Sequence, residues 1–336
     1  MASKSDGALV RDWRVADQLV QGIVMSRMTA RLVAFLASLF ATVASPAYAI
    51  DRVQEHTLQF GGTARTYLVY APKRIEQRDA ALVIALHGNG GSGENFLKQG
   101  KWVKKAHAEG FILVAPDGVP ERDDKPARFR DNRRSWNAGP ETGSSAQLRG
   151  IDDVNFIRAL IAEVKRDHRI DTRRIYVTGF SNGAGMAFRV GAELSDIIAA
   201  IAPVSNAMLL PVEELKKPVS LLLIWGSEDP LNPIDGGVVK RSGDKRTRPS
   251  AAASWTRWAE LLGCNKTPHA SKLSPAVEKQ TYASCRDGSA AEFIKVDGMG
   301  HQWPGGEVVM RVVSGPGSSA LDATDVIWTF FQAHSR

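Results

Sequence analysis

The stretch RRIYVTGFSNGAGMAFRVGAEL, residues 173–194, changes character around a single serine. Its first part, RRIYVTG (173–179), is a short apolar run of the kind that forms a strand buried on both faces of a sheet. Its last part, AGMAFRVGAEL, consists of small and apolar residues that suit a helix. The two parts meet in the motif G-x-S-x-G at residues 179–183. The stretch therefore predicts a strand, a sharp turn and a helix, with Ser181 at the corner.

Further apolar runs lie on both sides of this stretch. Short buried strands are expected at residues 81–87, 111–116, 219–226 and 291–298. Helical patterns alternate with them, one continuing from the glycine-rich turn to residue 109 and others at residues 150–168 and 325–334. Before them, HTLQF (56–60) and RTYLVYAP (65–72) flank a glycine turn and predict a hairpin. This order predicts an α/β fold: a mostly parallel central sheet, helices on both faces and an N-terminal antiparallel hairpin.

The N-terminal segment has the features of an exported precursor. Arg27 and Arg31 precede an apolar core at residues 32–43. Ala-Tyr-Ala follows at residues 47–49, with small residues in the pattern of a cleavage site. The pattern predicts a secretory signal peptide cut after Ala49, and hence a secreted or periplasmic protein. A membrane anchor is the alternative, but the apolar run is short for crossing a bilayer.

These features divide the chain in two. Residues 25–49 are the core of the expected signal peptide, and residues 1–24 precede its natural start. We therefore expect translation to begin at Met25 or Met28. The remainder, residues 50–336, shows no internal repeat and no linker rich in Pro, Gly or Ser. We expect it to be one domain, with no membrane span after signal cleavage.

The charge of the chain is mildly basic. The formal net charge is +7, and 24% of the residues are charged. Nucleic-acid binding usually requires basic residues clustered on one face, so no nucleic-acid partner is expected. Residues 120–134, PERDDKPARFRDNRR, form a mixed-charge insertion that predicts a solvated loop. The alternative is a rim that attracts an anionic substrate. Nothing in the sequence indicates an obligate protein partner.

The chain has two cysteines, Cys264 and Cys285. In an oxidising compartment an even pair at this spacing favours one disulfide, which would stabilise the fold by roughly 3 kcal/mol. Two buried free thiols or a catalytic cysteine are the alternatives. The second lacks a nearby histidine pattern.

A serine at a sharp turn acts as a nucleophile only with a base and an acid that orients the base. The run LLLIWG is followed by Ser-Glu-Asp-Pro, where Asp229 stands at the point at which the chain leaves the sheet. Glu228 and Asp235 are weaker candidates for the acid. The last predicted strand leads into GMGHQWPGG, where glycines give access to His301. Ser181, Asp229 and His301 follow hydrolase order and are the candidate catalytic residues.

Acyl transfer also requires two N–H donors for the oxyanion. We expect one from the backbone amide of Asn182, which follows the serine. The other should come from the loop LHGNGG after the strand at 81–87, and we expect it to be the backbone amide of Asn89. His87, in the same loop, is expected to brace it through hydrogen bonds, and an alternative role as the base is weaker.

The same loop fits a competing interpretation. Gly88, Gly90 and Gly93 form G-x-G-x-x-G between a strand and a helix, with Asp117 further on, as in dinucleotide-binding proteins. The motif alone is weak, and an exported enzyme has little access to NAD. It would also leave the three candidate catalytic residues as coincidence. A P-loop is excluded, since no Gly-Lys-Ser/Thr follows.

The chain resembles exported polyhydroxybutyrate-depolymerase-like esterases, which are grouped with the feruloyl and acetylxylan esterases of carbohydrate esterase family 1. The resemblance covers about residues 55–335 and is carried by segments in the same order: LHGNGGSGENF, VAPDG, SWNAG, GIDDVNFIRALI, RIYVTGFSNGAGMA, IAPVSN, GSEDPLNPIDGG and GMGHQWPGG. It implies a single α/β-hydrolase catalytic domain over residues 50–336. It also implies hydrolysis of carboxylic esters by Ser181, Asp229 and His301, without cofactor or metal.

Two details concern the match to this family. Members often carry a second glycine after G-x-S-x-G, where this chain has Ala184. The extra methyl group is expected to tighten the turn without affecting the chemistry. The cysteine pair also matches positions seen in the family, which agrees with a disulfide.

The resemblance leaves the ester substrate open among small, oligomeric and polymeric molecules. Depolymerases that attack solid polymers typically add a substrate-binding domain, for which this chain has no segment left, so soluble esters are favoured. Trp303, two residues beyond the candidate base, and Trp136 are possible walls of the substrate pocket. For both, packing inside the protein is the competing interpretation.

Two other functions remain possible from the sequence. One is a serine peptidase of the same fold. The other is a non-catalytic binding protein on this fold. Such proteins usually lose a member of the triad, whereas this chain retains all three candidates.

Overall fold

The computed structural model describes residues 53–75, 78–140, 142–238 and 247–336. The predicted signal peptide at residues 25–49, its cleavage site and the expected starts at Met25 and Met28 lie outside the described residues. By its contacts, Ile50–Arg336 forms one unit. No helix within the described ranges is both long enough and apolar enough to pass through a bilayer.

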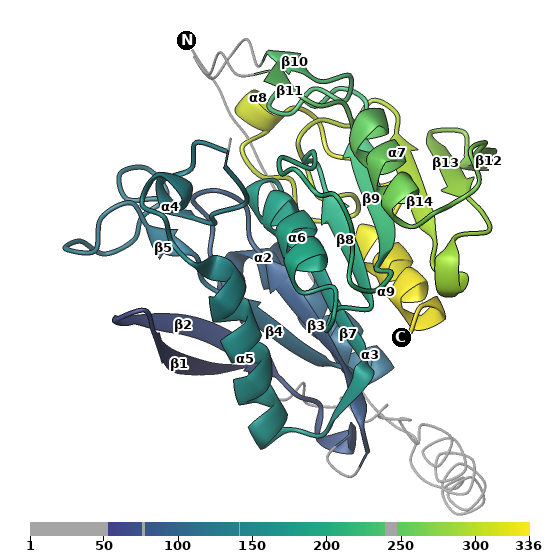
Figure 1. The fold of residues 1–336 in the computed structure, drawn as a ribbon. Coiled ribbons are helices and arrows are strands. Elements are labelled where there is room, and N and C mark those ends of the chain that lie inside the picture. The colour runs from purple at the N-terminus through teal and green to yellow at the C-terminus, as the bar shows by residue number, and fades with distance from the viewer. Residues whose placement is uncertain (1–52, 76–77, 141, 239–246) are drawn as a thin grey trace, which may run out of the picture. The chain divides into compact units, whose positions relative to one another are not determined.

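The described residues build one ten-stranded sheet (Figure 1). In chain order its strands are β1 (Gln54–Phe60), β2 (Thr63–Tyr70), β3 (Ala80–Leu86), β4 (Ile112–Pro116), β7 (Ile170–Phe180), β8 (Ala200–Val204), β9 (Ser220–Gly226), β12 (His269–Ser274), β13 (Val277–Tyr282) and β14 (Ala291–Val296). Across the sheet they lie in the order β1-β2-β4-β3-β7-β8-β9-β14-β13-β12. The central strands from β4 to β14 pair in parallel, and antiparallel strands flank them on both sides. The predicted α/β class and N-terminal hairpin are confirmed.

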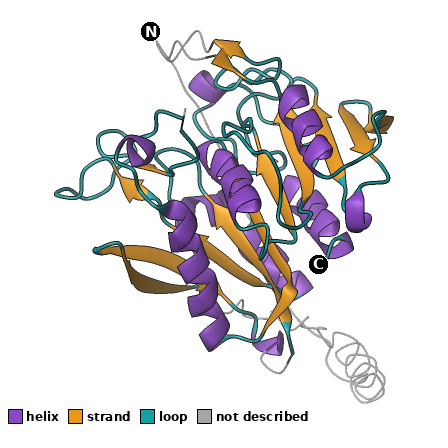
Figure 2. Cartoon of the chain, in the orientation of Figure 1, coloured by secondary structure: helices purple, strands orange, loops and turns teal. Residues whose placement is uncertain are grey.

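Helices cover both faces of the sheet (Figure 2). They are α2 (Gly93–Gln99), α3 (Trp102–Glu109), α4 (Ser145–Leu148), α5 (Asp153–Asp167), α6 (Asn182–Glu193), α7 (Ala251–Leu261), α8 (Arg311–Ser314) and α9 (Ala323–Ala333). Shorter elements are η1 (Lys73–Ile75), β5 (Val119–Pro120), β6 (Arg134–Ser135), β10 (Gly237–Val238), β11 (Thr247–Arg248) and η2 (Arg286–Gly288). Helices α5, α6 and α7 pack on one face, and α2, α3 and α9 pack on the other.

Each face of the sheet buries its own hydrophobic cluster. One cluster includes Phe188 of α6 and Trp258 of α7, and the other includes Trp102 of α3 and Phe331 of α9. Strands between two such clusters must be apolar on both sides, and every residue of β3 and β9 is buried. Full burial of a valine, leucine or isoleucine side chain in these strands contributes about 1.5–3 kcal/mol to the stability of the fold. The continuous apolar runs in the sequence are therefore the central strands.

Three features differ from the expectation. The helical pattern up to residue 109 is two helices, because Gly100 ends α2 and Lys101 has a left-handed φ of 55°. A Cβ at residue 100 would lie 2.6 Å from the Trp102 ring, so this passage requires glycine. Strand β8 was not predicted, although it lies between β7 and β9. The antiparallel pair β12–β13 was also missed.

The predicted disulfide is confirmed. Cys264 and Cys285 are bonded to each other. The bond ties the chain just after α7 to the turn after β13, and so fixes the antiparallel edge of the sheet to a helix on its face. The alternatives of free thiols and a catalytic cysteine are excluded.

Candidate active site

Ser181 occupies the sharp corner between β7 and α6. Its backbone has φ 54° and ψ −118°, a strained conformation for a residue with a side chain. The turn is tight because α6 begins against the end of β3: a Cβ on Gly183 would lie 2.2 Å from the carbonyl oxygen of Leu86. The side chain of Ser181 remains partly exposed. The predicted strand–turn–helix is present with its serine at the corner.

The backbone of Ser181 is held from the neighbouring strand β8. The Ser181 amide donates to the Val204 carbonyl at 2.9 Å. The side-chain amide of Asn206 donates to the Ser181 carbonyl at 2.8 Å. Asn206 is 5% exposed, and its own Oδ1 accepts from the Ala207 amide at 2.9 Å. No role was predicted for Asn206, although it lies in the segment IAPVSN, whose first part is the unpredicted strand β8.

Asp229 and His301 are joined although 72 residues separate them. The Nδ1–H of His301 donates to Oδ2 of Asp229 at 2.7 Å, and both residues are about 95% buried. The other carboxylate oxygen, Oδ1, accepts from the amides of Leu231 and Asn232 at 2.9 and 2.8 Å. The carboxylate is therefore immobilised, and it fixes the imidazole tautomer with Nε2 free to accept a proton. Glu228 and Asp235, the weaker candidates, are exposed.

His301 lies on a loop with little room. Its amide donates to the Ser314 carbonyl at 2.6 Å, and a Cβ on Gly300 would lie 2.3 Å from that same oxygen. The imidazole centre lies 4.8 Å from the ring centre of Phe180, the residue before Ser181. Within the described ranges, no hydrogen bond joins Ser181 Oγ to His301. Catalytic contacts of this kind are often long in unliganded proteins and shorten when substrate binds.

Two backbone amides beside Ser181 have no hydrogen-bond acceptor in the described part of the chain. Asn182 is the first residue of α6, where N–H groups lack an intrahelical partner. Asn89 lies in the loop after β3, and neither amide donates a hydrogen bond to any described residue. A Cβ on Gly88 would lie 3.3 Å from the Cβ of Ser181, so this loop passes directly over the serine. Both amides are thus available to an oxyanion, and the helix N-terminus adds a favourable dipole.

His87 braces this loop from below. Its Nδ1–H donates to the Gly88 carbonyl at 2.7 Å, and its Nε2 accepts from the Gly118 amide at 2.9 Å. The ring is 1% exposed, and this burial lowers the pKa of His87 to about 4. Because the neutral His87 imidazole makes a hydrogen bond at each ring nitrogen, it has no free lone pair with which to act as the base. The structural role expected for His87 agrees with this arrangement.

The dinucleotide-binding interpretation does not fit the same loop. In that family the pyrophosphate sits at the helix N-terminus. Here the amide of Gly93 donates instead to the Asp117 carboxylate at 2.8 Å. A second carboxylate oxygen of Asp117 contacts Thr66 and Arg134. A negative charge already fills the place that a phosphate would need.

Trp303 and Trp136, the possible walls of the substrate pocket, both lie in the protein interior, which favours the competing interpretation of packing inside the protein. Trp303 is 2% exposed and packs edge-on against Phe96 and Trp102, while its Nε1–H donates to Thr324 at 3.1 Å. Trp136 is fully buried. Trp303 sits over the α2–α3 break, which the sequence did not reveal.

Comparison with known proteins identifies the family of this chain. Residues 71–242 match the model of the family described as phospholipase/carboxylesterase. The chain belongs to this family. It is therefore an esterase of the α/β-hydrolase superfamily. NocK of Nocardia uniformis subsp. tsuyamanensis, described as a candidate esterase, is 30% identical over 80% of this chain and 79% of its own length.

Other relatives of the esterase bear more specific names. Feruloyl esterase B of Piromyces equi is 28% identical over 66% of this chain and 39% of its own length. The bifunctional acetylxylan esterase/xylanase XynS20E of Neocallimastix patriciarum is 25% identical over 71% of this chain and 31% of its own length. The chain thus spans about a third of these two proteins. An acetyl xylan esterase from Aspergillus awamori shares the fold, with a TM-score of 0.56, 14% identity and coverage of 84% of this chain and 100% of the other.

Proposed function

We propose that the protein is a serine carboxylesterase in which Ser181 is the nucleophile, His301 the base and Asp229 the acid that orients it. The observation that carries the proposal is the buried 2.7 Å contact between His301 and Asp229, beside a serine held at φ 54°. These residues follow β7, β9 and β14 in the chain, and so lie beyond the carboxyl ends of parallel strands. Ligand sites of open α/β sheets form at that edge.

The reaction proceeds by two acyl transfers. His301 Nε2 takes the hydroxyl proton of Ser181 while the Oγ of Ser181 bonds to the ester carbonyl carbon. The amides of Asn182 and Asn89 stabilise the resulting oxyanion. His301 then protonates the alkoxide as the C–O bond breaks, which releases the alcohol and leaves an acyl-enzyme. In the second transfer a water molecule attacks the acyl carbonyl carbon and gives a proton to His301. His301 then returns this proton to Ser181 Oγ as the bond between Oγ and the acyl carbon breaks, which releases the acid and restores Ser181. Asp229 holds the imidazole in place throughout.

The names of two relatives support a proposal for the substrate class. We propose soluble esters of small acyl groups, with feruloyl and acetyl esters as the first candidates and polyhydroxybutyrate as the alternative. The chemistry requires no cofactor. We also propose export, with residues 50–336 as the mature catalytic domain after a cut behind Ala49. N-terminal sequencing of the product of the full gene in a secreting host would test the cut.

The triad is tested by paired substitutions in protein purified after expression of the full chain. Ser181→Ala should lower kcat on p-nitrophenyl acetate by at least a thousandfold. Asp229→Asn should also lower kcat severely, whereas Asp235→Asn, a change in an exposed rival on the same loop, should not. Equal activity of the two aspartate variants, or full activity of Ser181→Ala, would refute the assignment.

A substrate panel separates the alternatives. Methyl ferulate, acetylated xylan, p-nitrophenyl esters and polyhydroxybutyrate should be tested in parallel with unblocked peptides. We expect turnover of at least one ester that depends on Ser181. Cleavage of peptides without any ester turnover would favour a peptidase, and binding without turnover would favour a non-catalytic protein.

A further inference from the structure

Trp136 makes hydrogen bonds to both of the segments that carry the proposed oxyanion donors. Its indole Nε1–H donates to the carbonyl of His87 at 3.0 Å. Its backbone amide donates to Oδ1 of Asn182 at 2.7 Å, and its carbonyl accepts from Nδ2 of the same side chain at 3.1 Å. The residue is fully buried. It therefore joins the loop after β3 to the first residue of α6.

Each of these bonds acts on an oxyanion donor through the backbone. Asn182 carries one proposed donor, and its side chain is locked in a two-bond clamp with the Trp136 peptide. The other donor, the amide of Asn89, shares a planar peptide with the carbonyl of Gly88. That carbonyl accepts from His87 Nδ1–H and from the Gly91 amide, so the Asn89 N–H points the opposite way. Trp136 fixes the preceding peptide of this loop.

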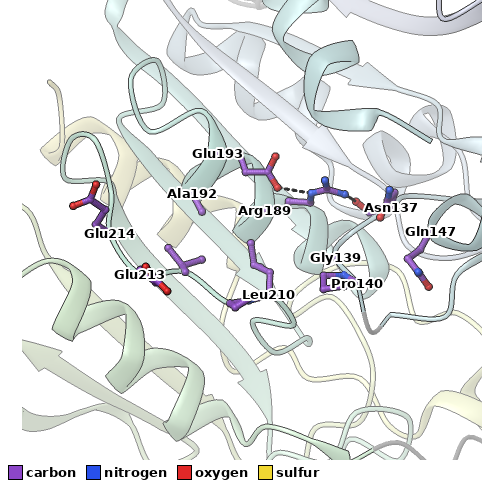
Figure 3. A pocket seen from close by; sticks show the side chains of 12 residues that line it. Asn137, Gly139, Pro140, Gln147, Arg189, Ala192, Glu193, Leu210, Glu213 and Glu214 are labelled. Atoms are coloured by element: carbon purple, nitrogen blue, oxygen red, sulfur yellow. Dashed lines mark hydrogen bonds and ion pairs between the residues drawn. The ribbon is translucent and has the colours of Figure 1, made fainter. Parts of the chain in front are cut away.

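The segment that carries Trp136 is itself held by charged side chains, of which Asp153 is fully buried and Arg189 is partly exposed. The Asn137 amide donates to the Asp153 carboxylate at 2.8 Å, and Arg189 of α6 donates to the Asn137 carbonyl at 2.8 Å. Figure 3 shows Arg189 between Glu193 and Asn137. Asp153 pairs with buried Arg65 at 2.8 Å. The motifs SWNAG and GIDDVNF, which the triad leaves unexplained, thus meet in one network.

From this we infer that Trp136 is a positioning residue, which sets the separation and direction of the Asn89 and Asn182 amides through its indole and its peptide. The inference rests on the proposed function. Oxyanion donors act only within a narrow range of distance, and small misplacements reduce rates steeply. Loss of the indole donor should affect the transition state more than the bound substrate.

The test compares two Trp→Phe variants of the full chain. Trp136→Phe keeps an aromatic ring but removes the donor to His87. Trp328→Phe is the matched control, since Trp328 is 4% exposed and, among the described residues, its Nε1 has no partner. It lies in α9 and stacks on Phe111 at 4.2 Å. For each variant we would measure kcat and KM on p-nitrophenyl acetate, the melting temperature and the inhibition constant of a phenylboronic acid.

We expect Trp136→Phe to lower kcat about tenfold and to change KM less than twofold. The inhibition constant of the boronic acid should rise by the same factor by which kcat falls. Trp328→Phe should leave kcat, KM and the inhibition constant near those of the wild type, even if its melting temperature falls as far as that of Trp136→Phe. Asn182→Ala, which opens the clamp and leaves the indole in place, should repeat the kcat effect. It serves as the second variant if Trp136→Phe does not fold.

The outcomes separate this inference from the proposed function. If the wild type hydrolyses esters through Ser181 but Trp136→Phe and Asn182→Ala keep full kcat, the inference alone is overturned. A loss of kcat in Trp328→Phe equal to that in Trp136→Phe would also overturn the inference, because the effect of Trp136→Phe on kcat would then come from altered packing. Absence of Ser181-dependent turnover in the wild type overturns the proposed function and this inference with it.

Discussion

Acid should destabilise this protein through His87 in particular. The imidazole is 1% exposed, and its Nε2 accepts a hydrogen bond from the Gly118 amide at 2.9 Å. Protonation would place two N–H groups against each other and a charge in the interior. Burial accordingly lowers the pKa of His87 to about 4, from 6.5.

The sign and size of the effect follow from proton linkage. Above pH 6.5 the ring is neutral in both the folded and the unfolded chain, so its contribution to stability is fully present. As the pH falls from 6.5 towards 4, only the unfolded chain takes up the proton, and stability is lost. Each pKa unit is worth about 1.36 kcal/mol, so the loss at pH 4.5 amounts to about 2.5 kcal/mol.

Urea unfolding of the wild type and of His87→Gln at pH 7.5 and 4.5 measures this term. The variant should be less stable at pH 7.5, because it cannot make both ring hydrogen bonds. The gap between the two proteins should shrink by about 2.5 kcal/mol at pH 4.5, since the variant has no proton to gain there. His269→Gln, at an exposed position of β12, should keep the pH dependence of the wild type. A gap that stays constant with pH would refute the reasoning.

Three other changes test the scaffold. Replacing both Cys264 and Cys285 by serine should lower the free energy of unfolding by about 3 kcal/mol in non-reducing urea titrations, with kcat within twofold of the wild type. Asp153→Asn should cost about 3–5 kcal/mol, because the Arg65 charge stays buried without its partner. The double change Arg65→Met with Asp153→Leu should cost less, and a cost that is equal or larger contradicts this account. Trp303→Leu should cost about 3 kcal/mol and leave KM within twofold; a large rise in KM at unchanged stability would return the indole to the substrate pocket.

Local patterns in the sequence predicted most of the strands and helices of the fold. The strands at the centre of the sheet are buried on both faces, so they appear in the sequence as continuous apolar runs such as ALVIALH. Strand β8 was missed because three of the five residues in AIAPV are alanine or proline, which are depleted in strands, so the run gives a weak signal. Strand β12 is exposed over nearly its whole length, so it has no alternation of apolar and polar residues to recognise. A strand leaves a recognisable pattern in the sequence only when at least one of its faces is buried.

The candidate catalytic residues were also accessible from the sequence. Each follows a strand, and parallel strands bring their carboxyl ends to one edge whatever their order in the sheet. Ser181, Asp229 and His301 could therefore be chosen from their places in the chain. The choice needed no knowledge of which strands are neighbours.

The supporting contacts depend on that neighbourhood, and only the tertiary structure decided them. Asn206 reaches the Ser181 carbonyl because β8 pairs with β7. Trp136 meets both His87 and Asn182 because the segment after β5 folds back over the ends of β3 and β7. For Trp303 the sequence left substrate contact and internal packing open, and the α2–α3 break gives its ring a buried site. A hydrogen bond between residues 46 or 49 positions apart leaves no periodic trace in the chain, since its partner is selected by packing and not by spacing.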